Sequence, residues 1–172
     1  MEKLLSERFV FRKAENTDND FEAYLSIKSE KDAIAFSGFS TAPNREHFRQ
    51  VYEKLMKSSN EYLYFLVDMD HDKEVAATFC LRKKDNVVAE IGGYHVLEKY
   101  RGMHLGYLMM LKIKDICKQM GCIQLVSAVA ENNIASIKSI ERSGAHFTGE
   151  YDMRTLPVFG TDVKFLHFVL EL

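Results

Sequence analysis

The sequence predicts a mixed α/β (α+β) domain in which helices pack on the faces of one central sheet. Apolar residues alternate with a period of two in some segments and recur every three or four residues in others. These segments follow one another in the order β-α-α-β-β-β-α-β-α-β-β, which is typical of a mixed sheet covered by helices. The chain has 172 residues, 47% of them apolar, so we expect a single domain over residues 1–172 with a sizeable core.

The first half of the chain is expected to form four strands and two helices. They are a strand around Phe9–Phe11, helices over Phe21–Phe36 and Asn44–Met56 joined near Ser37–Phe39, and strands over Tyr62–Asp68, Val75–Arg82 and Val87–Val96. Apolar residues three and four positions apart, such as Phe48, Val51 and Leu55, indicate the helices. Polar turn residues separate the three later strands, which predicts an antiparallel meander.

The second half contains the helix with the strongest periodic pattern. Its apolar positions run from Leu105 to Met120, and Gly121 follows as the expected C-terminal cap. The remaining elements are a strand over Ile123–Ala130, a helix over Ile134–Arg142 capped by Asn132 or Asn133, and strands over His146–Tyr151 and Val163–Leu170.

Charge and composition exclude several classes of protein. Lys and Arg total 23 against 25 Asp and Glu, so no basic excess favours nucleic acid as a partner. Residues 1–12 lack the apolar run of a signal peptide, and no apolar run is long enough to span a membrane. Cys80, Cys117 and Cys122 cannot all pair, and they lack zinc-site spacing. We therefore expect a cytoplasmic protein with reduced thiols.

A metal site is not expected either. Asp68, Asp70 and Asp72 alternate as in a metal-binding loop, but no glycine or glutamate follows at the spacing of a calcium loop. A solvated hairpin explains these aspartates better.

The segment with the clearest chemistry is the turn Tyr100–Tyr107, between a strand and the strongest helix. A glycine-rich turn at a helix N-terminus directs unpaired backbone N–H groups and a partial positive charge at one point. Its natural ligand is an anion such as a pyrophosphate, and Arg101 offers a further cation. The spacing matches neither a dinucleotide fingerprint nor a Walker phosphate loop.

The turn resembles motif A of the GNAT acetyltransferase superfamily, an Arg/Gln-x-x-Gly-x-Gly/Ala turn that binds the pyrophosphate of acetyl-CoA. Arg101 and Gly106 match its first and last positions, while His104 replaces the central glycine. The segments 130–137 and 141–145 resemble the second signature of the family, an Asn-x-x-Ala/Ser helix that ends in a glycine turn. Its Asn-x-Ala-Ser-Ile form, from Asn133, is similar to that of ribosomal-protein and small-amine N-acetyltransferases.

The resemblance implies a mainly antiparallel sheet of about seven strands flanked by about four helices. The strand Val87–Val96 would diverge from Ile123–Ala130 and open a V-shaped cleft for acetyl-CoA. Backbone amides of the turn would hold the pyrophosphate, and the other residues would meet the pantetheine arm. The implied donor-binding residues are His95, Val96, Arg101, Gly102, Met103, His104, Leu105, Gly106, Tyr107, Asn133 and Ser136.

The implied reaction is direct acetyl transfer to a primary amine in a ternary complex. A free alkylamine is mostly protonated at neutral pH, so a base is needed, and Glu90 resembles the family's catalytic glutamate in its register. The alternative to a catalytic role for Glu90 is an ordinary solvent-facing carboxylate. For His95 and His104 the alternative to catalysis is a structural or surface role. Many family members carry at the position of Ile140 a Tyr that acts as general acid. In its absence Ser136, Ser139, Tyr94 or a water would have to donate a proton or a hydrogen bond to the leaving thiolate, or the thiolate would leave unaided.

The acceptor stays open between a small amine and a protein N-terminus. Its pocket would be built from residues 21–56 and the hairpin 151–166, and the aromatic candidates to line it are Tyr24, Phe36, Phe39 and Phe159. The acidic stretch Glu30–Asp32 would either line that pocket or lie on the surface. The alternative function is an inactive acyl-CoA sensor or interaction module. The protein is expected to be a monomer or a homodimer.

Overall fold

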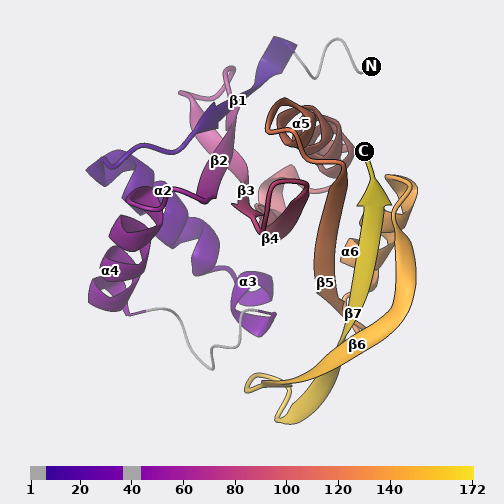
Figure 1. The fold of residues 1–172 in the computed structure, drawn as a ribbon. Helices are drawn as coiled ribbons and strands as arrows, with labels where there is room; N and C mark the ends of the chain where they lie inside the picture. The colour runs from indigo at the N-terminus through magenta and orange to yellow at the C-terminus, as the bar shows by residue number, and fades with distance from the viewer. Residues whose placement is uncertain (1–6, 37–43) are drawn as a thin grey trace.

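The computed structural model describes residues 7–36 and 44–172, and its centre is a seven-stranded sheet with the strand order β1-β2-β3-β4-β5-β7-β6 (Figure 1). Only β4 and β5 pair in parallel, and every other neighbouring pair is antiparallel. The expected mixed, mainly antiparallel sheet is thus confirmed. The strands are β1 (Phe9–Lys13), β2 (Glu61–Asp68), β3 (Glu74–Lys83), β4 (Val88–Val96), β5 (Gln124–Ala130), β6 (His146–Leu156) and β7 (Thr161–Glu171).

The described residues form five α-helices and one short 3-10 helix. They are α2 (Asp18–Lys28), α3 (Lys31–Ala35), α4 (Arg45–Met56), η1 (Glu98–Tyr100), α5 (Leu105–Gln119) and α6 (Ile134–Arg142). Two expected caps are present: the Asn133 side chain caps α6, and Gly121 adopts φ +79° just beyond α5.

The one continuous helix expected over Phe21–Phe36 is wrong, because the chain breaks into α2 and α3 at Ser29 and Glu30. Glu30 takes an extended conformation as the N-cap residue of α3. Its carboxylate accepts a hydrogen bond from the Glu98 backbone N–H at 3.1 Å and lies 2.7 Å from the His95 ring. These partners are distant in sequence, so no local pattern could reveal the break. The expected junction Ser37–Phe39 lies outside the described residues.

The helices cover both faces of the sheet. Adjacent residues of a strand point to opposite faces. On β2, Phe65 lies under the guanidinium of Arg12, which bonds to Asp20 of α2. The neighbouring Tyr64 interacts electrostatically with Cys117 of α5. Helix α2 therefore lies on one face, which we call the α2 face, and α5 on the other. The stripe expected on α5 is confirmed as core, with its residues Leu105, Met109, Ile113 and Cys117 all buried.

Strands β6 and β7 form a long curved ribbon at one edge of the sheet (Figure 1). Strand β6 continues five residues beyond the expected end at Tyr151, to Leu156. Its side chains are mostly exposed, so it lacks the apolar alternation by which strands are recognised. Polar cross-strand contacts, such as Thr155 with Asp162 at 2.6 Å, support this part of the ribbon. No helix among the described residues is long and apolar enough to cross a membrane.

Candidate functional site

Strands β4 and β5 pair over only three positions and then separate. The last pair joins Glu90 to Val126, although β4 continues to Val96 and β5 to Ala130. Backbone polar groups on the facing edges of these two segments consequently have no partner strand between them. The hydroxyl of Ser127, just beyond the last pair, is buried and has no hydrogen-bond partner among the described residues. The separation leaves a polar seam in the middle of the sheet.

Strand β4 carries a bulge within this open segment. Thr78 pairs with His95 and Cys80 with Gly92, so Gly93 and Tyr94 together oppose a single residue of β3. Gly93 adopts φ +57°, a backbone conformation that favours glycine. Although β4 is a central strand, Gly92 and Gly93 are exposed. The bulge therefore brings accessible backbone to the seam.

The turn expected to bind an anion lies directly before α5. His104 adopts φ +59° and ψ 18°, the left-handed conformation that a glycine would supply at this position. Its carbonyl accepts hydrogen bonds from the N–H groups of Tyr107 and Leu108 at 3.1 and 3.4 Å, which begins the helix. The first N–H groups of a helix have no intrahelical partner, so those of the turn are available to an anion. The histidine thus holds a left-handed backbone conformation that glycine adopts without strain.

The Arg101 side chain is turned towards α3. Its guanidinium lies 2.7 Å from Asp32 and 3.2 Å from Glu30, and its Nε donates to the Val96 carbonyl at 3.2 Å. Arg101 therefore joins the turn to α3 and to the end of β4. Glu30 and Asp32, expected as surface residues or as lining of an acceptor pocket, are bound to this arginine.

Glu90 lies at the point where the strands separate. Arg82 of β3 stands between two carboxylates, 2.6 Å from Glu61 and 3.4 Å from Glu90. The three residues are directly opposite one another on adjacent strands, so they share one face of the sheet. Leu63 and Phe65 alternate with Tyr64 along β2, which places Glu61 and its cross-strand partners on the α2 face. The Glu90 side chain is 31% exposed.

Helix α6 follows β5 and lies beside the start of α5, where the Ser139 Oγ is 3.2 Å from the position that a Cβ on Gly106 would occupy. The Asn133 side chain accepts a hydrogen bond from the Ser136 N–H at 3.2 Å, which fixes the start of the helix. Ile140 is buried in the core. The Tyr94 hydroxyl crosses from β4 and donates to the Gly106 carbonyl at 2.7 Å, and burial raises the pKa of this phenol to about 12. Tyr94 therefore stays protonated at neutral pH and links β4 to α5.

Sequence reasoning missed Lys28, the last residue of α2. Its Nζ lies 3.2 Å from the position that a Cβ on Gly93 would occupy, and the Cβ of Cys80 is 3.9 Å from the same point. Burial lowers the pKa of this amine. A lysine in the last turn of a helix is normally a solvent-exposed partner of the helix dipole, so no sequence signal pointed to the seam.

The aromatic residues expected around the acceptor lie in different environments. Phe36 and Phe159 meet with ring centroids 5.6 Å apart, joining the end of α3 to the β6–β7 turn. Tyr24 instead packs in the core, against Phe48 and Tyr52. Phe39 lies outside the described residues.

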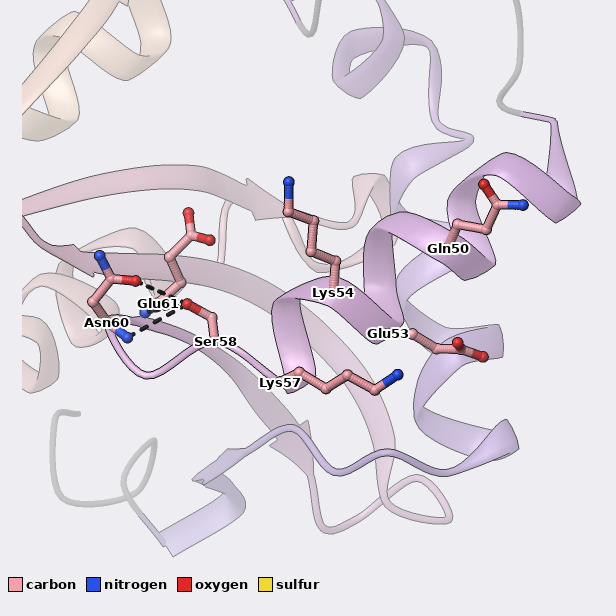
Figure 2. Close-up of a pocket in the computed structure, with 7 residues that line it drawn as sticks. All are labelled: Gln50, Glu53, Lys54, Lys57, Ser58, Asn60 and Glu61. Carbon is pink, nitrogen blue, oxygen red and sulfur yellow. Dashed lines mark hydrogen bonds between the residues drawn. The ribbon is translucent and has the colours of Figure 1, made fainter.

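A surface hollow of about 600 Å³ lies along α4 and the turn that follows it (Figure 2). It is lined by Gln50, Glu53, Lys54, Lys57, Ser58, Asn60 and Glu61. None of the expected donor-binding residues reaches it. The described residues also hold no cluster of three side chains able to bind a metal ion.

Comparison with known proteins agrees with this geometry. The model of the acetyltransferase (GNAT) family matches residues 6–145. No curated protein matches the chain by sequence. Among solved structures, the spermidine N-acetyltransferase of Vibrio cholerae in complex with CoA and spermine superposes with a TM-score of 0.82, at 12% identity over 96% of each chain.

Two further structures share the fold. The GNAT-family acetyltransferase from Bacillus anthracis has a TM-score of 0.75, at 16% identity over 95% of each chain. The ribosomal-protein-S18-alanine N-acetyltransferase from Escherichia coli has a TM-score of 0.72, at 15% identity over 95% of this chain and 93% of its own. With the family model covering most of the chain, the protein belongs to the GNAT family of acetyltransferases, enzymes that use acetyl-CoA as the acetyl donor.

Proposed function

We propose that this protein transfers the acetyl group of acetyl-CoA to a primary amine by direct transfer within a ternary complex. The observation that carries the proposal is the seam between β4 and β5, which begins beyond Glu90 and runs along β4 to Val96, where Arg101 of the turn donates to the backbone carbonyl. A donor at the turn and an acceptor on the α2 face would meet there, so no covalent enzyme intermediate is required.

The polar groups around the seam fit the donor. In the turn 102–107, the Tyr107 N–H donates to the His104 carbonyl, so the N–H groups of residues 102–106 would hold the pyrophosphate. The β4 backbone at His95 and Val96 would pair with the pantetheine amides. The hydroxyl of Ser127, which has no hydrogen-bond partner within the described ranges 7–36 and 44–172, is a polar group of the kind that such an arm satisfies. Asn133 and Ser136 would border the arm from α6. When bound, acetyl-CoA supplies a thioester, which is already activated for attack by an amine.

Glu90 is the proposed general base. Its carboxylate is partly exposed, and among the described residues its one ion pair is with Arg82 at 3.4 Å, so it keeps the capacity to accept a proton from the acceptor. The His95 ring is the other candidate for the base on this face, but its Nε2 already lies 2.7 Å from the Glu30 carboxylate. Proton removal by a positioned base typically contributes about 10²–10⁴-fold to a rate.

The backbone N–H groups of His95 or Val96 would stabilise negative charge on the reacting carbonyl oxygen, an effect usually worth about 3–4 kcal/mol. The leaving thiolate cannot receive its proton from the position that supplies it in many family members, because Ile140 has no proton to donate. Tyr94 donates its hydroxyl hydrogen to Gly106. We therefore keep Ser136, at the start of α6, as the proposed partner of the thiolate.

The acceptor that fits best is a small amine. The contact between Phe36 and Phe159 joins α3 to the β6–β7 turn, and such a bridge restricts a groove that a polypeptide N-terminus would need. The alternative function is an acyl-CoA sensor without turnover. It is motivated by Ile140, which occupies the position where many family members carry the Tyr that acts as general acid.

A panel of small amines and of peptides with free N-termini tests the proposal. Each is incubated with the protein and acetyl-CoA, and free thiol and acetylated product are measured together. Turnover on small amines, lost in the Glu90→Gln variant, is the expected result. Stabilisation by acetyl-CoA without turnover on any amine would favour the sensor, and turnover on peptides alone would contradict the small-amine acceptor.

A further inference from the structure

The Lys28 amine lies on the side of the seam from which an acceptor amine must approach. Glu90 and the bulge residue Gly93 face α2, and the Lys28 Nζ extends from the end of that helix over Gly93. Gly93 has no side chain and is exposed, so nothing of its own separates the amine from the β4 backbone. Two residues further on, His95 begins the stretch proposed to bind the thioester carbonyl.

No carboxylate of the part of the chain that the structure describes pairs with this amine. Among the described residues the Lys28 side chain has neither an ion pair nor a hydrogen bond, and Cys80 is the titratable group that acts electrostatically on it. The other cation of this face, Arg82, is bound by Glu61 and Glu90. The Tyr24 ring, 5.5 Å from the Nζ, gives only a weak attraction.

These surroundings favour the neutral amine. Burial without a counter-ion penalises the ammonium and lowers the pKa of Lys28. A neutral amine is a nucleophile, whereas an ammonium would serve to anchor a carboxylate of the acceptor. The position of the Nζ over Gly93, together with this lowered pKa, points to a reactive amine.

We propose that Lys28 is a site of self-acetylation, at which the protein modifies its own side chain when acetyl-CoA is bound and no acceptor is present. The inference rests on the proposed function, because it needs the thioester to lie at the β4 bulge. In the reaction the Nζ forms a bond to the acetyl carbon while the carbon–sulfur bond breaks. The amine gives up one proton, CoA leaves as a thiol or thiolate, and Nζ ends as a neutral amide.

Intact-mass and peptide mass spectrometry test this directly. The full chain is incubated with acetyl-CoA alone, and the acetylated fraction of Lys28 is compared with that of Lys31, an exposed lysine at the same corner. We expect the Lys28 peptide to be acetylated at least about tenfold faster than the Lys31 peptide, since a positioned nucleophile reacts at a high effective molarity. An unreactive analogue, desulfo-CoA in excess, should suppress the modification of Lys28 only.

Variants complete the test. Lys28→Arg should lose the fast modification and Lys31→Arg should keep it, with the melting temperature of each recorded to show that the chain still folds. If wild-type protein binds acetyl-CoA and acetylates free amines while Lys28 reacts no faster than Lys31, the inference is wrong and the proposed function stands. If acetyl-CoA does not bind at all, both are wrong.

Discussion

The guanidinium of Arg101 lies 2.7 Å from the carboxylate of Asp32, although the two residues are 69 positions apart in the chain. The contact fastens the turn before α5 to α3, the short helix that Phe36 directly follows. Donor and acceptor sides of the proposed site are thereby held together by an ion pair.

The Arg101 contact predicts that this arginine acts on the donor by fastening the turn. Arg101→Ala and Asp32→Ala should then raise the KM for acetyl-CoA by similar factors, while unfolding in urea shows a loss of about 0–1 kcal/mol for this partly exposed pair. If Arg101 instead bound the pyrophosphate directly, Asp32→Ala would free it, and the KM would stay unchanged or fall. Steady-state kinetics of the two variants separates these cases.

Glu90 and Glu61 form a matched pair for testing the base, because both carboxylates contact Arg82 but only Glu90 lies where the strands separate. We expect Glu90→Gln to lower kcat by about 10²–10⁴-fold, as the loss of a general base does. Glu61→Gln should leave kcat nearly unchanged. Equal losses in the two variants, or a loss in Glu90→Gln that high pH fails to relieve, would contradict the role of Glu90.

The left-handed backbone of His104 predicts opposite effects for two substitutions. His104→Gly accepts φ +59° without strain and should preserve both stability and affinity for acetyl-CoA. His104→Val places a β-branched residue in this conformation, at a cost of about 1–2 kcal/mol, and should weaken donor binding. Chemical denaturation and calorimetric titration with CoA measure the two effects. Weaker binding in the glycine variant would mean that the imidazole itself contacts the donor.

Asp68 predicts how stability depends on acid. The hydrogen bonds from Arg8, at 2.6 and 2.8 Å, hold the pKa of this buried carboxyl well below its usual value. Its stabilising contribution is therefore complete above the unfolded pKa of about 3.9 and is lost as the pH falls through the folded pKa. Urea unfolding between pH 2 and 7 should show a steep acid loss in the wild type.

The matched variants for that titration are Asp68→Asn and Asp70→Asn. The first should be less stable at pH 7 and should lose less on acidification, because the group that titrates is gone. The second removes an exposed carboxylate 3.7 Å from Arg8 and should leave the acid profile close to that of the wild type. Parallel profiles for wild type and Asp68→Asn would show that other carboxylates dominate.

Much of the fold follows from the local sequence, because burial imposes a period on each element. The stripe of α5 and the cap at Asn133 could be located from spacing alone. The break at Glu30 could not be located in this way, because it is caused by contacts with His95 and Glu98, which are distant in the sequence. The end of β6 could not be predicted because most of its side chains are exposed, so its sequence shows no apolar alternation.

The candidate site divides in the same way. The turn before α5 was recognisable because glycines and a helix start are local features. Packing between distant segments determines the other features of the site. They are the left-handed backbone of His104, the direction of Arg101 towards α3 and the position of the Lys28 amine near Gly93. Family resemblance located Glu90, but only the cross-strand row with Arg82 and Glu61 assigns it to the α2 face.

The most direct test of the central claim is amide hydrogen exchange of the protein with and without acetyl-CoA. If the donor lies in the seam, protection should rise in two segments: residues 102–107 of the turn and residues 93–96 of β4. The hollow along α4 should be unaffected. Protection around residues 50–61, or no change in the turn and in β4, would contradict the account.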